Sequence, residues 1–446
     1  MKTKTLLAST VIAVWLPFAA SVRVATATCA APTTWYVATT GSDTTTCGTQ
    51  TSPCRSINYV QSNKMPLGDT VLVAPGTYDE NDPAFGTIVT NNIAGTSSLC
   101  KITYKSQVKW GAVIIGADNS ATQTDATNHP GWWNFQSYAI IDGFDFVGRP
   151  NNTTNGTYAS EWGVVLAGAQ NNPRTGDHSI LQNSRVHGFA LTSAMCIGDG
   201  GAGVGVRSVH SQVIGNVIYG NGFFPCSTVH GIYWKFAYGL AAENIIYGNG
   251  GIGLQEWGAS SNVTVVNNTI FGNAYSGILV GNDGAGDDGG PTTNTGSFVD
   301  NNIVYNNASQ GGTGIKEYCS SMHPNCVGVT GNCSLPVNVF DNNILYHNPR
   351  ATGNISLVTG VQSGTIQSDP LFTSNQLDGT GIYIGRPSLN DQSGSVSPAL
   401  DAGLMTDTNT CGQQPPFAFP NYDFAGNPRA DNGGTNFDIG AWECSY

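Results

Sequence analysis

The sequence predicts an all-β parallel solenoid, in which short strands stack coil upon coil. A six-residue pattern, Asn-x-x-Tyr/Phe-x-Asn, recurs through the middle of the chain, and a Gly followed by Ile or Leu lies between its copies. Of the 446 residues, 57 are Gly and 42 are Asn, and only 10% are charged. Gly and Asn favour turns over helices. A repeat of 20 to 40 residues built from short strands is typical of a solenoid.

The Asn pattern begins at five positions, Asn216, Asn244, Asn268, Asn302 and Asn343, which are 28, 24, 34 and 41 residues apart. One coil cannot bury its apolar face alone, so coils stack and equivalent residues lie about 4.8 Å apart. We expect the Asn side chains to form a hydrogen-bonded ladder, and the aromatic residue of each copy to stack on the next. We assign both columns a structural role. The aromatic column comprises Tyr219, Tyr247, Phe271, Tyr305 and Tyr346.

The Gly-hydrophobe segments predict one outward face. They begin at Gly231, Gly253, Gly277 and Gly314. Alternate residues of a strand point to opposite sides, so an inward Ile232 makes Tyr233 point outward. The same register gives two outward columns, Tyr233, Gln255, Leu279 and Lys316, and then Lys235, Trp257, Gly281 and Tyr318. Aromatic rings beside polar groups suit a sugar ring, although an ordinary solvated face has a similar pattern.

Both ends of the chain carry motifs with a recognisable arrangement. The N-terminal part contains Trp35-Tyr-Val-Ala-Thr-Thr-Gly-Ser-Asp43, Cys54-Arg-Ser-Ile57 and Gly68-Asp-Thr-Val-Leu-Val-Ala-Pro-Gly-Thr-Tyr78, and the C-terminal part contains Asp369-Pro-Leu-Phe372, Ser397-Pro-Ala-Leu-Asp-Ala-Gly403, Asp423-Phe-Ala-Gly-Asn-Pro-Arg429 and Asp438-Ile-Gly-Ala-Trp-Glu443. The arrangement resembles secreted right-handed parallel β-helix proteins of the pectate-lyase-like superfamily. The resemblance implies a short amphipathic helix, around residues 57–64, that caps the solenoid. It leaves the reaction open, because the superfamily contains lyases, hydrolases, epimerases and adhesins.

Residues 1–27 have the pattern of a secretory signal, with Lys2 and Lys4, an apolar stretch and a small-residue cleavage site. We expect residues 28–446 to form one secreted domain, extracellular or periplasmic, without a membrane span and monomeric. Residues 28–110 would form the cap and first coils, 111–368 the central coils, and 369–446 the last coils and closing segment. Removal of the signal takes three cations away, so the formal charge falls from −12 to −15. This balance excludes a general nucleic-acid binder, which needs a basic face.

The eleven cysteines all follow the signal, and in an exported protein they predict disulfides. Their spacing favours Cys47–Cys54, one pair among Cys319, Cys326 and Cys333, and Cys411–Cys444. An odd count leaves at least one cysteine unpaired. A zinc site using His323 and the three neighbouring cysteines is the alternative for that segment.

The leading functional hypothesis is a lyase that cleaves a uronic-acid-containing polysaccharide by β-elimination. The reaction needs the substrate carboxylate neutralised, often by Ca²⁺, and a base to remove the proton beside it. By analogy with that chemistry, Lys316 is the first choice for the base, Lys235 the second, and His230 would protonate or bind. The loop after residue 282 would hold Ca²⁺ through Asp283, Asp287 and Asp288. The substrate-binding residues would be Tyr233, Gln255, Trp257, Tyr318 and Arg185.

Two other classes remain open. An inverting glycoside hydrolase would use Glu256 and Glu317, which lie at equivalent positions two coils apart, roughly 9.6 Å along the axis. Inverting pairs lie about 6.5–9.5 Å apart, so the fit is marginal, and the strand alternation makes the two residues inward-pointing or corner residues. A non-catalytic glycan-binding or adhesin solenoid is the third class. The negative net charge repels an acidic polymer at long range, unless a metal ion or a local basic patch compensates.

Overall fold

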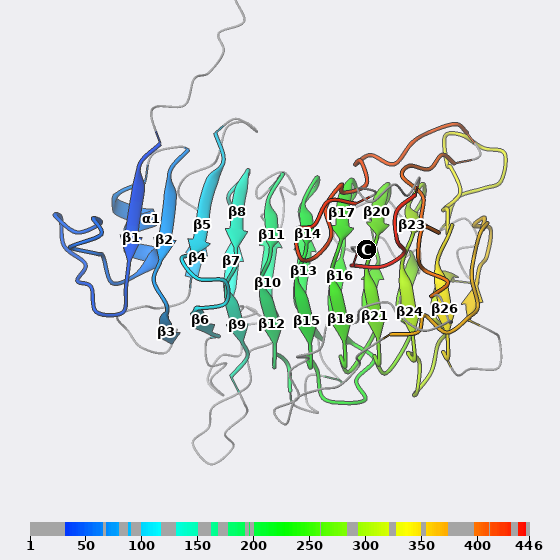
Figure 1. Cartoon of the computed structure of the whole chain (residues 1–446), viewed down its shortest axis with the longest axis horizontal. Coiled ribbons are helices and arrows are strands. Elements are labelled where there is room, and N and C mark those ends of the chain that lie inside the picture. Colours follow the sequence, from blue (N-terminus) through cyan, green and yellow to red (C-terminus); the bar gives the residue numbers. More distant parts are fainter. Residues whose placement is uncertain are drawn as a thin grey trace, which may run out of the picture.

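The protein is a parallel β-helix whose coils stack along one long axis (Figure 1). The computed structural model describes residues 32–65, 68–79, 88–90, 100–116, 131–149, 162–167, 177–191, 196, 200–258, 260–282, 293–320, 327–348, 354–372, 397–409, 411–429 and 436–442. The predicted signal, residues 1–27, lies outside them. In the described part of the chain, the single α-helix has seven residues, and no helix there is long and apolar enough to cross a membrane.

Three parallel sheets, each with nine strands in the described residues, form the walls of the β-helix. Sheet A contains β1 (Thr34–Val37), β2 (Thr70–Val73), β5 (Ile102–Ser106), β8 (Ala139–Asp142), β11 (Ile180–Gln182), β14 (Gln212–Ile214), β17 (Gly239–Ala242), β20 (Val263–Val266) and β23 (Phe298–Asp300). Sheet B contains β3 (Gly76–Asp79), β6 (Ala112–Ile115), β9 (Asp145–Val147), β12 (Arg185–His187), β15 (Val217–Tyr219), β18 (Ile245–Tyr247), β21 (Thr269–Phe271), β24 (Ile303–Tyr305) and β26 (Ile344–Tyr346). Sheet C contains β4 (Ile88–Thr90), β7 (Trp132–Asn134), β10 (Trp162–Ala167), β13 (Gly201–Arg207), β16 (Val229–Trp234), β19 (Leu254–Glu256), β22 (Ile278–Asn282), β25 (Ile315–Cys319) and β27 (Ile355–Ser356).

The predicted coil register is confirmed. Ile232 pairs with Leu254, Leu254 with Ile278, and Ile278 with Ile315, and all four side chains are fully buried. Each Asn pattern forms two ladders rather than one. Asn244 Nδ2 donates to Asn268 Oδ1 at 2.9 Å, and Asn249 Nδ2 donates to Asn273 Oδ1 at 2.9 Å. The ladders satisfy backbone groups at the turns that a buried coil would otherwise leave unpaired.

The aromatic column also stacks as predicted. Tyr219 and Tyr247 have ring centroids 5.0 Å apart, and Tyr247 and Phe271 are 4.9 Å apart, close to the spacing of the coils. Tyr305 and Tyr346 stack at 6.0 Å. These rings lie on sheet B, outside the central core.

Close packing requires a glycine at the start of the Gly-hydrophobe segments of sheet C. A Cβ on Gly253 would lie 2.6 Å from the carbonyl oxygen of Gly277 and 2.9 Å from Nδ2 of Asn273. The corresponding Gly231 would meet Gly253 and Asn249 in the same way. The strand therefore starts where the backbone runs against the Asn ladder, and a side chain larger than hydrogen does not fit.

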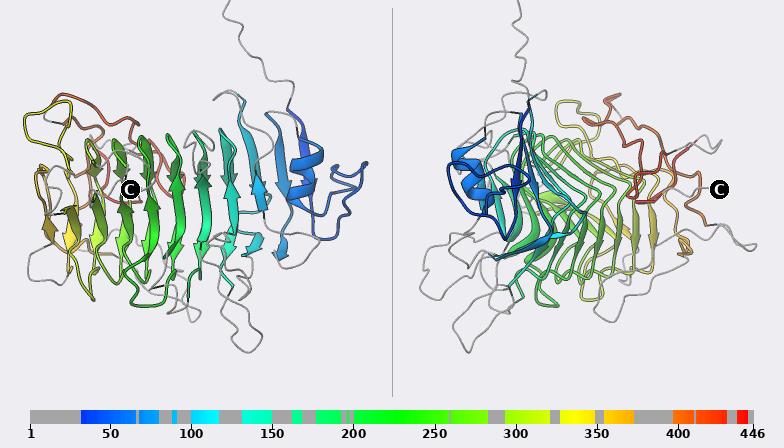
Figure 2. Two further views of the ribbon diagram at one scale, coloured as in Figure 1. Left: turned by 180° about the vertical axis from the view of Figure 1, so that it is seen from behind. Right: turned by 60° about the vertical axis from the view of Figure 1, so that its left-hand side comes forward.

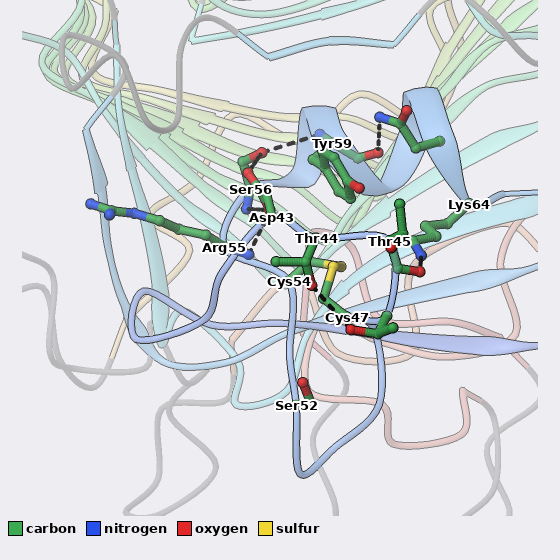
Figure 3. Close-up of a disulfide and its surroundings, with 12 residues drawn as sticks. Asp43, Thr44, Thr45, Cys47, Ser52, Cys54, Arg55, Ser56, Tyr59 and Lys64 are labelled. Atoms are coloured by element: carbon green, nitrogen blue, oxygen red, sulfur yellow. Dashed lines mark hydrogen bonds between the residues drawn. A yellow bond between two sulfur atoms is a disulfide. The ribbon is translucent and has the colours of Figure 1, made fainter.

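A short helix caps the N-terminal end, as the resemblance implied (Figure 3). Helix α1 (Ile57–Asn63) begins after Ser56, whose Oγ accepts a hydrogen bond from the backbone N–H of Tyr59 at 3.1 Å. Asp43 fixes this cap by accepting from the backbone N–H groups of Arg55 and Ser56. The predicted Cys47–Cys54 disulfide is present beside the cap.

The C-terminal segment, hereafter the strap (described residues of 397–442), folds back over the coils (Figures 1 and 2). Phe419 and Phe437 pack on Leu240 and Val266 of sheet A. The same strap covers sheet B with apolar and aromatic side chains, Ala399, Phe424, Ile439, Ala441 and Trp442. The strap therefore covers part of the outer face of sheet A, at β14, β17 and β20, and part of that of sheet B.

A buried ion pair and a disulfide anchor the strap. The Arg429 guanidinium donates to both carboxylate oxygens of Glu243, and both residues are buried. Cys333 bonds to Cys411 across 78 residues of sequence. The predicted Cys411–Cys444 pair is therefore wrong, and the zinc alternative is excluded because Cys319 and Cys333 are both disulfide-bonded. A third bond, Cys196–Cys226, was not expected. These bonds suggest an oxidising location outside the cytoplasm.

Candidate functional site

Sheet C presents the outer face that the described part of the strap leaves uncovered. Its outward side chains form two columns that follow the predicted register. Tyr233 pairs with Gln255, Gln255 with Leu279, and Leu279 with Lys316. The second column contains Lys235, Trp257, Gly281 and Tyr318, with Gly281 directly opposite Tyr318. The structure therefore brings together residues that are up to 85 positions apart in the chain. We call these two columns and their N-terminal continuation the sheet C face.

Aromatic rings on this face are ordered by glycines beside them. Trp257 and Tyr318 stack with centroids 5.6 Å apart and planes 19° apart, although one coil separates them. The intervening Gly281 has no side chain to hold them apart, and a Cβ there would lie 2.9 Å from that of Tyr318. In the N-terminal half, a Cβ on Gly205 would lie 2.8 Å from the ring of Trp162. Glycine thus allows each ring to lie along the face.

The face extends further than the sequence predicted. Trp133 stacks on Phe135 at 5.2 Å, and Trp162 lies 6.3 Å from Tyr233 in a tilted contact. This part of the chain contains three tryptophans, Trp132, Trp133 and Trp162. Only Trp132 belongs to the central core, whereas the other two pack in an outer cluster with Tyr233. Strand alternation correctly puts Trp132 and Trp133 on opposite sides of sheet C. It fails for Trp162, because the inward–outward alternation of β10 is interrupted at Gly163, between the outward Trp162 and the inward Val164.

The charged side chains of these two columns, within the described residues, are all cations. The guanidinium carbon of Arg207 lies 5.1 Å from the ring centroid of Trp162. The ammonium groups of Lys235 and Lys316 lie 5.9 Å and 4.9 Å from the ring centroids of Tyr233 and Tyr318. The two lysines are three coils apart, roughly 14 Å, so they cannot contact the same sugar ring. The face is locally basic in a protein of net charge −12.

Several polar atoms on the face are buried without a hydrogen-bond partner among the described residues. They are Nε1 of Trp133, Nε1 of Trp162, Nε of Arg207 and Oε1 of Gln255. Burial of an unpaired polar group costs about 1–3 kcal/mol.

Glu256 and Glu317 point inward, which is one of the two orientations that the strand alternation allows. Glu256 is fully buried, its Oε2 accepts from Ser297 Oγ at 2.7 Å, and burial raises its pKa to about 8. Glu317 is 2% exposed and accepts four hydrogen bonds, from the N–H groups of Val358, Thr359 and Gly360 and from Asn338 Nδ2. Neither carboxyl group reaches the outer face, so the structure does not support a hydrolytic pair in a groove there.

Two other predicted residues are placed differently from the expectation. His230 is 5% exposed, its Nδ1 accepts from the backbone N–H of Ile252, and burial lowers its pKa to about 3. It is therefore a neutral ring stacked on Tyr233 rather than a charged acid. Arg185 belongs to β12 of sheet B, where it pairs with Asp145 and lies over Trp110. Arg185 therefore lies on a different side of the β-helix from the sheet C face, and its role in substrate binding stays a prediction. The calcium candidates Asp283, Asp287 and Asp288 lie outside the described residues.

Comparison with known proteins supports the fold. Neither a family model nor a curated protein sequence matches the chain. Among solved structures, pectate lyase Pel9A is similar with a TM-score of 0.54 and 15% identity, over 94% of this chain and 98% of that one. A rhamnogalacturonan lyase has a TM-score of 0.49 and 16% identity over 80% and 95% of the two chains. The complex of XylC with xylose has a TM-score of 0.44 and 10% identity over 92% and 98%. At these identities, the similarity to Pel9A shows a shared parallel β-helix fold.

Proposed function

We propose that the protein is a secreted enzyme that binds a uronic-acid-containing polysaccharide along the sheet C face and cleaves it by β-elimination. One observation carries the proposal: the sheet C face, which the described part of the strap leaves uncovered, combines aromatic rings with cations. Tryptophan and tyrosine rings contact the apolar faces of sugars, and the cations Arg207, Lys235 and Lys316 attract carboxylates. The fold is that of pectate lyase Pel9A.

The chemistry assigns distinct tasks to the face. A base removes the proton from the carbon next to the uronate carboxylate, the bond from the neighbouring carbon to the glycosidic oxygen breaks, and a carbon–carbon double bond forms. The leaving oxygen then takes a proton. We keep Lys316 as the first candidate for the base and Lys235 as the second. A calcium ion held by Asp283, Asp287 and Asp288 would neutralise the carboxylate, and these residues follow directly in sequence after β22 of the same sheet.

The direct test is a panel of acidic and neutral polysaccharides, each assayed with calcium and with a chelator. Reducing ends and the ultraviolet absorbance of an unsaturated product are measured together. A lyase raises both signals on acidic substrates. Reducing ends without absorbance would identify a hydrolase, and binding without any product would identify a glycan-binding protein. Either of these outcomes would overturn the proposal.

A lysine substitution then tests the base. We expect Lys316→Ala to lower kcat by about 10²- to 10⁴-fold, the range for loss of a general base. Lys105→Ala is the matched control, because it removes the same charge from a different face. Lys105 is exposed on sheet A, where it pairs with Asp142. Full activity of Lys316→Ala would refute the assignment, and Lys235→Ala would then be tested in the same assay.

A further inference from the structure

A cluster of two histidines and a carboxylate lies at one corner of the β-helix, outside the two columns of the sheet C face. Asp177 and His178 precede β11 on one coil, and His210 precedes β14 on the next. The backbone N–H of His178 donates to the carbonyl of Val209 at 3.2 Å, which places the two turns side by side. His178 and His210 both have φ values in the left-handed region, +58° and +55°. The same turn is therefore repeated, and the two imidazoles project in parallel.

Three ligand atoms converge at this corner. Oδ1 of Asp177 lies 3.0 Å from Nδ1 of His178 and 3.2 Å from Nδ1 of His210, and all three atoms lie within 4.8 Å of one another. Nδ1 of His178 is buried and has no hydrogen-bond partner among the described residues. The three side chains are 20–39% exposed, so the cluster lies at the surface of the β-helix.

The donor set suits a divalent transition metal. Imidazole nitrogen and carboxylate oxygen are ligands for Zn²⁺ and Cu²⁺, whereas Ca²⁺ prefers oxygen ligands only. A tetrahedral ion with bonds of about 2.0–2.2 Å places its ligand atoms about 3.3–3.6 Å apart. The two nitrogen–oxygen distances of 3.0 and 3.2 Å are within a few tenths of an ångström of that requirement.

A second His–Asp contact in the chain shows why the corner differs. His187 Nε2 lies 3.1 Å from Oδ1 of Asp145, and His187 stacks on Tyr219 much as His178 stacks on Tyr138. However, the Arg185 guanidinium already pairs with the Asp145 carboxylate, so a metal ion would be repelled there. Among the described residues, the ion pairs of Asp177 involve histidine alone.

We propose that Asp177, His178 and His210 form a binding site for a divalent transition-metal ion, with Zn²⁺ as its probe. The two imidazoles are now 10° from parallel with centroids 4.6 Å apart, so their Nδ1 lone pairs run side by side. Binding therefore requires the rings to tilt toward each other. The tilt opens the stack that continues to Tyr138 on one side and Tyr238 on the other.

The test titrates the chelator-treated, full secreted protein with Zn²⁺ by calorimetry, and with Co²⁺ by absorption spectroscopy. One equivalent should bind, and Ca²⁺ should not compete. His178→Gln and His210→Gln should each weaken Zn²⁺ binding at least tenfold, whereas His187→Gln, the matched control, should leave it unchanged. Circular dichroism confirms that each variant is folded. Absence of a bound equivalent in the wild type, or equal affinity in His178→Gln, His210→Gln and His187→Gln, would overturn the proposal.

Discussion

Glu256 is a carboxyl group that the fold holds in its protonated form. It is fully buried beneath sheet C, and burial raises its pKa from 4.5 to about 8. Ser297 Oγ donates to its Oε2, while its Oε1 and the nearby Asn294 Oδ1 are both buried without a partner among the described residues. A proton on Oε1 would make that atom a hydrogen-bond donor. Replacement by Gln supplies an N–H group in the same place without an ionisable proton.

The sign and size of the effect follow from this pKa. The folded state binds the proton more tightly than the unfolded state, so the stabilisation from Glu256 is fully present below pH 4.5 and is lost as the pH rises through about 8. The loss amounts to about 5 kcal/mol over that window, at about 1.4 kcal/mol per pH unit. We therefore expect Glu256→Gln to match the wild type near pH 4 and to exceed its free energy of unfolding by about 5 kcal/mol above pH 8.

The assay is urea denaturation of both proteins, with disulfides intact, followed by tryptophan fluorescence across this pH range. A difference between the two proteins that does not change with pH would refute the reasoning. Glu317→Gln is the matched control, because Glu317 occupies the equivalent register position but accepts four hydrogen bonds. In Glu317→Gln, the new amide N–H group faces the N–H groups that donate to the carboxylate. We therefore expect the free energy of unfolding to fall by about 1–3 kcal/mol near neutral pH. Polysaccharide cleavage by Glu256→Gln should be retained, whereas a hydrolase using this acid would lose it.

Two further substitutions test the packing of the fold. Arg429→Met leaves Glu243 buried without its cation, so we expect the free energy of unfolding to fall by about 3–5 kcal/mol, measured by urea denaturation, and the strap to become sensitive to limited proteolysis. Lys105→Ala removes an exposed ion pair and should lower the free energy of unfolding by less than about 1 kcal/mol. Equal losses in Arg429→Met and Lys105→Ala would contradict the argument. Gly253→Ala places a Cβ 2.6 Å from the carbonyl oxygen of Gly277, so a loss of about 1–3 kcal/mol is expected in the same assay. Gly220→Ala meets no atom within 4 Å and should lose only about 1 kcal/mol from its positive φ, so a larger loss there would show that backbone strain, not crowding, decides the result.

The sequence predicts those parts of the fold that neighbouring coils impose on each other. Asn244 and Asn268, or Tyr247 and Phe271, are in contact across 24 residues, and the same contact is repeated at each coil. Because each coil makes the same contact with its neighbours, each coil has the same residue at that position. The Asn ladders, the aromatic stack and the register of sheet C can therefore all be predicted from the spacing of these residues in the sequence. The outward direction of Lys235 and Lys316 follows from the same alternation.

Contacts made once leave no such pattern. Glu243 meets Arg429 across 186 residues, and Asn301 donates to the carbonyl of Leu404 across 103. Nothing periodic links these positions, so the path of the strap, the Cys333–Cys411 bond and the covering of sheets A and B were not predicted. Arg185 lies on a different side of the β-helix from the sheet C face. It belongs to the Asn-pattern strand of its coil, which lies on sheet B, and not to the Gly-hydrophobe strand.

The path of the strap explains why a protein with so many acidic residues can present a basic face. Along β19 and β25, strand alternation buries Glu256 and Glu317 and turns Lys316 outward. The strap then covers apolar outer residues of sheets A and B along part of the β-helix, so an extended ligand cannot reach those residues. The sheet C face is not covered by the described part of the strap, and there Arg207, Lys235 and Lys316 follow the axis of the coils. A chain of sugars that lies along that axis would meet cations and rings in turn. This geometry supports the proposal that the substrate is an extended acidic polysaccharide.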